Sequence, residues 1–252
     1  MCRHTQFISH KLFARVLSPV THQSLFLNQS VKLGLRLLAI EQMVTRHYDN
    51  IWDCCCDHGL LGMRLLEKQA AEKVHFVDVV ESLVNGVNQA LSGNPELYPA
   101  DQWQTLCMDV ARLPVSEAST HKGDSHLVII AGVGGDLLFE LVEAIHKANP
   151  ETNIEFLLCP VRQHFHVRES LINMGMKLIN ESIVYENRLF YEIIHVARKG
   201  REELTCVGSK MWDFSDEDHC LYLQQTVSHY QRRLKSGCEK TAAILQQYQN
   251  LR

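Results

Sequence analysis

The stretch Ile51-Trp-Asp-Cys-Cys-Cys-Asp-His-Gly59 decides the fold of this 252-residue chain. It begins as an apolar strand over 51–56, and Gly59 supplies the backbone freedom that a tight turn needs before a helix over 60–69. The same change recurs downstream. We expect further strands at 73–79, 103–108, 126–131 and 154–159, and further helices at 82–91, at 136–147 and after residue 159. The alternation predicts an α/β fold whose parallel sheet is covered on both faces.

The end of this region departs from the alternation. Segments 177–184 and 188–197 are rich in β-branched and aromatic residues, and only Tyr185-Glu-Asn187 separates them. No helix fits into that gap, so the pair predicts an antiparallel hairpin. A doubly wound, mostly parallel sheet that ends in an antiparallel hairpin is the Rossmann-like arrangement expected of class I methyltransferases. An ordinary dinucleotide-binding domain more often has another crossover there.

The two ends of the chain predict helices outside the sheet. Ser30 fits an N-cap for a helix in which Leu33, Leu37, Ile40 and Val44 recur at helical spacing. Ser215 and Asp218 resemble a capping box, and apolar residues at steps of four and three from Leu223 to Tyr248 predict a long C-terminal helix. Gly237 marks where that helix bends or breaks. We therefore expect an N-terminal extension (1–30), a ligand-binding α/β domain (31–200) and a helical appendage (201–252) that packs as a coiled coil or on that domain.

Composition excludes several classes of protein. Hydrophobic residues make up 46% of the chain, enough for a core, and no apolar run is long enough to cross a bilayer. The nine cysteines lack CxxC spacing, which favours reduced thiols and a cytoplasmic protein. Three adjacent thiols on a strand alternate between its faces, so we expect no metal site at Cys54–Cys56.

Charge is unevenly distributed. The net charge of -4 is not that of an obvious nucleic-acid binder, yet residues 1–46 hold six Lys/Arg and one acid, Glu41. This is either a solvated face or a local footprint for phosphates. Residues 1–30 hold no acid at all, which fits either an organelle transit peptide or an extension before the domain; the few arginines favour the extension.

Candidate cofactor residues follow the first three strands. In doubly wound sheets ligands lie beyond the carboxyl ends of the strands, where Asp53, Cys55, Asp57 and Gly59 are expected. An acid there suits S-adenosylmethionine, which carries an ammonium and a sulfonium. Asp78, with Val79 beside it, comes nineteen positions after Gly59 and can accept from ribose hydroxyls, a spacing that nicotinamide enzymes share.

Two further segments complete this predicted site. After the third strand, Met108 can pack on an adenine ring and Asp109 can accept from its amine, or Asp109 is simply a turn or cap residue. After the fourth strand, Ala131-Gly-Val-Gly-Gly135 marks close approach of the backbone to a ligand, with Ala131 and Gly132 as contacts. No Lys-Ser/Thr pair follows, so a phosphate-binding P-loop is not indicated.

These segments together resemble the bacterial tRNA (adenine-22-N1)-methyltransferase family. The likeness runs over about residues 31–250. It rests on Arg36-Leu-Leu-Ala-Ile40, Asp57-His58-Gly59, Asp78, Gly132-Val-Gly-Gly135, Met174-Gly-Met and Tyr191-Glu-Ile-Ile194. The resemblance implies a class I fold, S-adenosylmethionine as methyl donor and N1 of an adenine in tRNA as acceptor. The chain departs from the family at Cys55, where glycine is usual, at Val133, where methionine is usual, and at Cys159-Pro-Val161, where a Pro-Asn pair is common.

A mechanism and its residues can be predicted from this reading. Methyl transfer to adenine N1 needs alignment more than a base, and Asp57, His58 and the backbone at Gly132 are the catalytic candidates. Backbone contacts to tRNA are expected from Arg36, Arg46 and Arg162 on the ligand-facing edge of the sheet, and from Arg232 and Arg233 on the appended helix. The protein is expected to be a monomer or a homodimer, without membrane or metal.

Two other functions remain open on the sequence. One is a nicotinamide-dependent oxidoreductase, which the terminal hairpin and the missing loop glycines disfavour. The other is a non-catalytic RNA-binding protein on the same fold, which the departures at Cys55 and Val161 allow.

Overall fold

The computed structural model describes residues 31–121, 123–235 and 239–251. In these residues, β1 (Tyr48–Cys54) pairs with β2 and β4 inside an eight-stranded sheet of order β3-β2-β1-β4-β5-β7-β6-β8. The other strands are β2 (Ala71–Asp78), β3 (Trp103–Cys107), β4 (Ser125–Ala131), β5 (Asn153–Cys159), β6 (Lys177–Glu186), β7 (Leu189–Ala197) and β8 (Glu202–Glu203).

Strand direction confirms the predicted doubly wound sheet. Strands β1 to β5 run parallel, whereas β7 is antiparallel to both β5 and β6. The chain builds outward from β1 to β3 and then crosses back to β4, so the switch point lies between β1 and β4. The hairpin turn consists of Asn187 and Arg188, both with positive φ, as a two-residue turn of type I′ requires.

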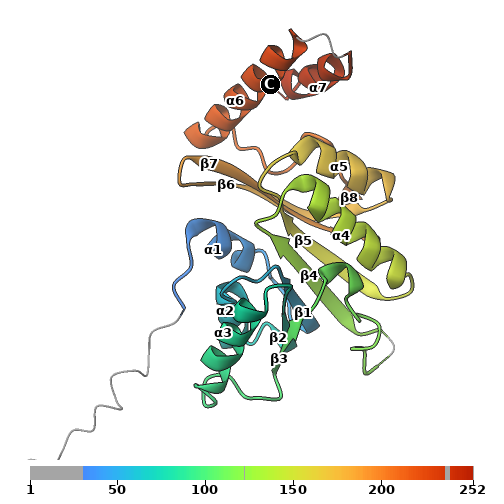
Figure 1. The fold of residues 1–252 in the computed structure, drawn as a ribbon. Helices are drawn as coiled ribbons and strands as arrows, with labels where there is room; N and C mark the ends of the chain where they lie inside the picture. The colour runs from blue at the N-terminus through green and yellow to red at the C-terminus, as the bar shows by residue number, and fades with distance from the viewer. Residues whose placement is uncertain (1–30, 122, 236–238, 252) are drawn as a thin grey trace, which may run out of the picture. The chain divides into compact units, whose positions relative to one another are not determined.

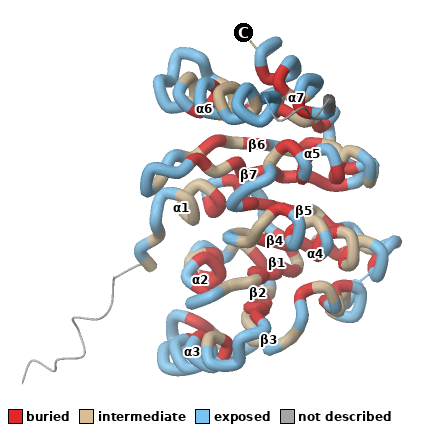
Figure 2. The backbone as a smooth tube through the Cα atoms, turned by 45° about the horizontal axis from the view of Figure 1, so that its top comes forward, coloured by how far each residue is buried: buried red, intermediate tan, exposed pale blue. Residues whose placement is uncertain are grey.

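Helices cover both faces of the sheet (Figure 1). Alternate residues of β4 explain why: Leu127 and Ile129 pack with α1 to α3, and Val128 and Ile130 pack with α4 and α5. Burial is accordingly concentrated in the central strands (Figure 2). These helices are α1 (Leu35–Gln42), α2 (Leu60–Glu67), α3 (Glu81–Ser92), α4 (Gly135–Ala148) and α5 (His164–Asn173), with a short 3-10 helix, η2 (Val110–Arg112), after β3.

Two predicted boundaries were wrong for local reasons. The first strand ends at Cys54, because Cys55 takes a left-handed conformation with φ of 55° and cannot continue it. Helix α1 begins at Leu35 with Gly34 as its N-cap, and no side chain caps it. The predicted N-cap, Ser30, lies outside the described residues, as does the whole predicted extension.

The C-terminal region contains two described helices where the sequence predicted one long helix with a bend or break; the predicted breaking residue, Gly237, lies outside the described residues. The helices are α6 (Glu217–Leu234) and α7 (Glu239–Gln249), and the rings of Tyr230 and Tyr248 stack at 5.6 Å. The predicted capping box named Ser215 as the capping residue of α6, which is wrong, because Asp216 is the N-cap. The side chain of Asp216 accepts from the N–H of Asp218, whereas the Ser215 hydroxyl bonds Asp213.

A buried ionic cluster fixes α5, the hairpin and α6 together. Arg168 of α5 is fully buried, and donates to Glu192 at 2.6 Å and to Glu181 at 2.7 Å. Tyr222 of α6 donates to the other oxygen of Glu192 at 2.6 Å. Because each buried charge has partners, α6 is anchored to the edge of the sheet by polar contacts as well as by packing.

The described chain from Val31 onward groups into one compact unit. The division of this unit at residue 200 stays a prediction. Among the described residues, no helix has the length and apolar character that a membrane span requires. Within the same residues, no cluster of His, Cys, Asp or Glu is arranged to hold a metal ion.

Candidate functional site

The loop between β1 and α2 is built from left-handed residues. Cys55, Asp57 and Gly59 have φ of 55°, 52° and 68°. A side chain at Gly59 would place its Cβ 2.9 Å from Cγ2 of Val87, so only glycine fits there. The loop therefore turns sharply at the carboxyl edge of the sheet, as the sequence predicted.

Asp78 at the end of β2 holds this loop in place. One carboxylate oxygen accepts from the N–H of Asp57 at 3.2 Å, and the other accepts from the N–H of Val80 at 3.0 Å. Asp78 as a whole is only 8% exposed. Each carboxylate oxygen can accept a second hydrogen bond, so Asp78 retains capacity for the hydroxyls of a ligand.

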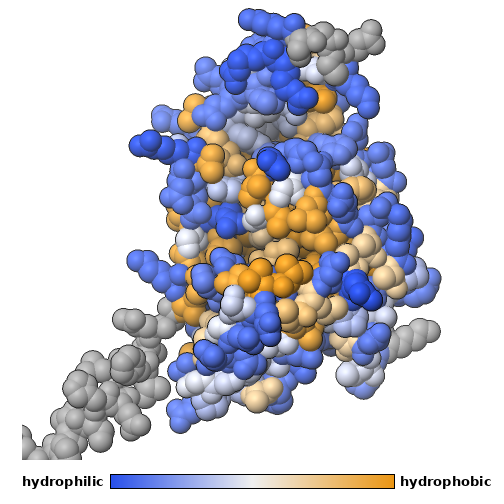
Figure 3. Space-filling view, in the orientation of Figure 1, coloured by the Kyte–Doolittle hydropathy of each residue, from blue (hydrophilic) through white to orange (hydrophobic). Residues whose placement is uncertain are grey.

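A cavity of about 250 Å³ lies beside the loop, between α1 and the ends of β1 and β4. Seven predicted site residues line it: Arg36, Asp53, Cys55, Asp57, His58, Ala131 and Gly132. Six lining residues were not predicted: Leu37, Cys54, Cys56, Leu60, Leu61 and Val133. Apolar side chains gather across the middle of the face seen in Figure 3, with hydrophilic ones above and below.

Asp53 acts mainly on α2. Its carboxylate accepts from the N–H of Gly62 at 2.9 Å and so satisfies a free donor of the first turn. Burial raises the pKa of Asp53 to about 7, although the Gly62 hydrogen bond lowers it. A Cβ at Gly62 would lie 2.3 Å from Cε1 of Phe76, so this contact also depends on glycine.

Asp57 and His58 lie at the rim of the cavity. Their side chains are 70% and 73% exposed, and Nε2 of His58 lies 3.6 Å from Oδ1 of Asp57. Solvent screens charges this exposed, so both residues are available to a bound partner but contribute little to the fold.

Cys55 presents a neutral thiol to the cavity. Burial, together with the neighbouring charges of Asp78 and Asp53, raises its pKa to about 11. The half-buried thiol therefore stays protonated at neutral pH. It occupies space that glycine would leave open.

Five predicted cofactor residues lie outside the cavity lining: Gly59, Asp78, Val79, Met108 and Asp109. Asp109 caps η2 by accepting from the N–H of Ala111 at 2.9 Å, which is the simple cap role. The N–H of Met108 donates to the carbonyl of Asp78, and Met108 packs against the core. Val79 is 65% exposed beside Asp78, so it lies at the surface and not in the cavity.

The loops after β4 and β5 are tied to each other. The N–H of Gly132 donates to the carbonyl of Cys159, and the N–H of Val161 donates to the carbonyl of Val133. Gln163 donates to the Asp136 carboxylate at 2.6 Å. The Gly132–Gly135 backbone is thereby held against the start of α5.

Arg36 reaches the site from α1. Its guanidinium lies 5.3 Å from the centre of the Tyr191 ring on β7, and its backbone N–H donates to Glu186 at 3.3 Å. The Glu186 carboxylate thus stabilises the start of α1 in place of an N-cap side chain. Sequence reasoning missed the roles of Glu186 and Tyr191, because 150 positions separate Glu186 from Arg36.

The predicted position of Arg46 was wrong. Arg46 precedes β1, at the amino end of the parallel strands and therefore opposite the cavity. It pairs with Glu155 at 2.8 Å, and its guanidinium lies 3.9 Å from the centre of the Tyr48 ring. The loop after α1 returns the chain across the sheet, so neighbours in sequence face opposite edges.

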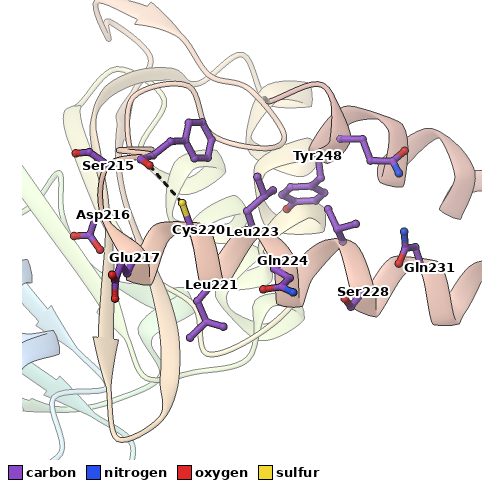
Figure 4. A pocket seen from close by; sticks show the side chains of 13 residues that line it. Ser215, Asp216, Glu217, Cys220, Leu221, Leu223, Gln224, Ser228, Gln231 and Tyr248 are labelled. Carbon is purple, nitrogen blue, oxygen red and sulfur yellow. Dashed lines mark hydrogen bonds between the residues drawn. The ribbon is translucent and has the colours of Figure 1, made fainter.

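A basic groove lies beside α6. It has a volume of about 890 Å³ and runs between the start of α5, the β6–β7 turn and α6. Three predicted RNA contacts, Arg162, Arg232 and Arg233, line it together with Arg188, which the prediction missed. A further concavity of about 730 Å³ also follows α6 (Figure 4), and its lining includes Asp216 and Glu217 but neither lysine nor arginine among the described residues.

Comparison with known proteins identifies the domain. The family model for the methyltransferase domain matches residues 33–194. No curated protein matches the chain by sequence. Sp1610 of Streptococcus pneumoniae in complex with S-adenosyl-L-methionine, assigned as a tRNA (m1A22) methyltransferase, has a similar structure. The TM-score is 0.69 at 18% identity, over 87% of this chain and 99% of that one.

Two other solved structures share the fold. TrmK of M. capricolum in complex with S-adenosyl-homocysteine gives a TM-score of 0.62 at 16% identity, over 86% of this chain and 93% of that one. The B. subtilis m1A22 tRNA methyltransferase TrmK gives 0.59 at 16% identity, over 87% and 95%. None of these comparisons favours an oxidoreductase or a non-catalytic scaffold.

Proposed function

This chain belongs to the methyltransferase-domain family, and from that premise we propose that it transfers a methyl group from S-adenosylmethionine to N1 of an adenine in tRNA. The observation that carries the proposal is the hydrogen bond from the N–H of Asp57 to the carboxylate of Asp78, at the carboxyl ends of β1 and β2 and beside the switch point of the sheet. It joins the left-handed loop to an acid at the end of β2, where doubly wound proteins bind nucleosides.

The residues present fit S-adenosylmethionine. Asp78 has free lone pairs for ribose hydroxyls, and Asp57 at the rim suits a cationic group. The buried Nη1 of Arg36 has no hydrogen-bond partner among the described residues and lines the same cavity. Bound there, the cofactor supplies a methyl group activated by its sulfonium.

The chain's own contribution to the reaction is alignment. Adenine N1 already carries a lone pair, so no side chain has to remove a proton first. Gly132 at φ of 86° leaves the cavity open on the side of β4. Asp57 and backbone carbonyls near Gly132 can stabilise the positive charge that develops on the base, and His58 is placed to contact the base or to order the loop.

The basic groove supports tRNA as the substrate class. The groove is lined by four arginines: Arg162, Arg188, Arg232 and Arg233. Nε of Arg162 lies 3.2 Å from a Cβ built at Gly134, in the loop after β4, so the groove extends to that loop. Phosphates along this groove would lead a strand towards the cavity, while the adenine is swung out of its stack. With tRNA as substrate, we expect the protein to act in the cytoplasm, as a monomer or a homodimer.

The test is methyl transfer to a defined RNA. The protein is incubated with labelled S-adenosylmethionine and unmodified tRNA, and digested nucleosides are identified by mass spectrometry. We expect label in N1-methyladenosine. Asp78→Ala should lose at least nine-tenths of this label, because a hydrogen bond to a charged group contributes about 1.5–3 kcal/mol and about 1.4 kcal/mol is a factor of ten. Asp101→Ala, which changes an exposed acid outside the cavity, should lose none of it. Label in no RNA, despite cofactor binding, would overturn the proposal in favour of a scaffold.

A further inference from the structure

Arg36 carries a buried donor that the fold leaves unused. Its Nη1 atom is inaccessible to solvent and has no hydrogen-bond partner among the described residues. Nor does the guanidinium have an ion pair within 4.0 Å among those residues. Buried polar groups are nearly always satisfied, so an exception at a cavity points to a missing ligand.

The surroundings hold this guanidinium in place without neutralising it. The Tyr191 ring lies 5.3 Å away, and Glu186 fixes the backbone of Arg36 at the start of α1. Burial raises the pKa of the nearby Cys159 thiol to about 11, although the charge of Arg36 and a hydrogen-bonding contact between the two side chains lower it. Because that thiol stays protonated, it is at best a weak acceptor for the arginine.

The unused donor lies in the candidate cofactor cavity. Arg36 lines it, and Nη1 lies 3.6 Å from a Cβ built on Gly132. Apart from His58 at the rim, Arg36 is the one basic residue among the described residues of the lining. At about 250 Å³ the cavity is smaller than the roughly 300 Å³ at which small-molecule sites begin, and Asp78 and Met108 lie outside it. It therefore fits one end of the cofactor and not the whole.

Charge identifies which end. S-adenosylmethionine has two cationic groups, the sulfonium and the ammonium, and one anionic group, the carboxylate. A guanidinium attracts the carboxylate and repels the other two. We propose that Arg36 binds the carboxylate of the methionyl part of S-adenosylmethionine. This assignment rests on the proposed function, and it gives Arg36 a cofactor role in place of the predicted contact with the tRNA backbone.

Two ligands that differ only in this group test the assignment. Titration calorimetry compares S-adenosylmethionine with its decarboxylated form, on the wild-type protein and on Arg36→Met. We expect the wild type to prefer the carboxylate form by about 10- to 100-fold, as for a charge-assisted hydrogen bond. Arg36→Met should lose that preference. Its affinity for the decarboxylated form should stay within about twofold of the wild type, because the variant loses only the pairing of the guanidinium with the ligand carboxylate.

Controls separate the alternatives. Lys32→Met removes an exposed charge from the same segment and should change neither affinity. Arg36→Lys should keep part of the preference for the carboxylate form. The comparison of the two ligands on the wild-type protein tests the assignment even if a variant fails to fold. Equal weakening of both ligands in Arg36→Met would reduce Arg36 to a structural role. If Arg36→Met binds the cofactor as the wild type does but has a raised KM for tRNA, then Arg36 contacts the tRNA and not the cofactor. A wild type that binds neither ligand would contradict the proposed function itself.

Discussion

The backbone N–H of Asp57 donates to the carboxylate of Asp78 at 3.2 Å, across 21 positions of sequence. One acid at the end of β2 thereby sets the conformation of the loop that follows β1. The second oxygen of Asp78 fixes the entry to α3 through Val80. The nucleoside site that we propose is therefore preorganised by backbone contacts before any ligand arrives.

Cys55 is predicted to limit cofactor binding. Its left-handed conformation costs a non-glycine residue about 1–2 kcal/mol, and its thiol lines the cavity. Cys55→Gly should bind S-adenosylhomocysteine more tightly. Its free energy of unfolding should be unchanged or up to about 1 kcal/mol higher, since the entropy of glycine offsets part of the relief. Calorimetry and urea denaturation measure the two effects.

The matched control for Cys55 is the next cysteine. Cys56 lines the same cavity without a positive φ, so Cys56→Gly should lower stability by about 0.5–1 kcal/mol. If Cys55→Gly destabilises the protein as much as Cys56→Gly does, and binds the cofactor no better, then position 55 does not restrict the site.

Arg168 is predicted to be essential for stability. Removing the charge in Arg168→Met leaves Glu181 and Glu192 buried without their cation, which should cost about 3–5 kcal/mol. Urea denaturation followed by circular dichroism measures the loss. His166→Ala on the exposed side of the same helix should change stability by less than about 0.5 kcal/mol. A comparable effect of both variants would mean that the ionic cluster is not what anchors this region.

The Glu155 carboxylate is predicted to make the stability of the fold depend on pH in the acid range. Burial raises its pKa, but hydrogen bonds with His195, Tyr48 and Arg46 outweigh burial and lower the pKa to about 2. The folded state therefore favours the ionised form. Its stabilising contribution is complete above the ordinary glutamate pKa of about 4.5 and is lost as the pH falls towards 2.

Denaturation midpoints at several pH values test this contribution. Glu155→Gln should be less stable than the wild type at pH 7, and the difference should shrink between pH 4.5 and pH 2. Glu151→Gln, which changes an exposed acid just before β5, should keep the wild-type profile. A difference for Glu155→Gln that is independent of pH would show that loss of packing, and not of charge, causes it.

The basic groove predicts how RNA affinity depends on salt. Replacing both Arg232 and Arg233 by alanine should weaken tRNA binding and lower the slope of log affinity against log salt by about two. Fluorescence anisotropy at several salt concentrations measures the slope. Lys240→Ala on α7, outside the groove, should leave it unchanged. A slope that the double variant does not alter would place RNA elsewhere on the molecule.

Local pattern was enough to predict the sheet but not every residue of the site. The apolar run from His126 to Ala131 predicted a doubly covered strand, and β4 is buried on both faces. The change from strand to helix at Gly59 was likewise visible, since glycine there is required by local geometry. Hydrophobic pattern and turn chemistry act over a few residues, and a single sequence displays them directly.

Contacts between distant residues were the part that the sequence did not reveal. Nothing near Arg36 predicts that Glu186 and Tyr191 support it, nor that Arg168 lies between Glu181 and Glu192. Arg46 was misplaced because its edge of the sheet depends on the direction of a loop, which side-chain type does not determine. Cys55 was assigned to a strand because cysteine gives no sign of a left-handed backbone.

The most direct test of the nucleoside site is the affinity of the wild type and of Asp78→Asn for S-adenosylhomocysteine, measured by titration calorimetry. We predict saturable binding at one site, weakened by about 10- to 100-fold in the variant, because ribose hydroxyls lose a charged acceptor. A wild type that gives no saturable heat, or a variant that binds as tightly as the wild type, would contradict the site proposed at the ends of β1 and β2.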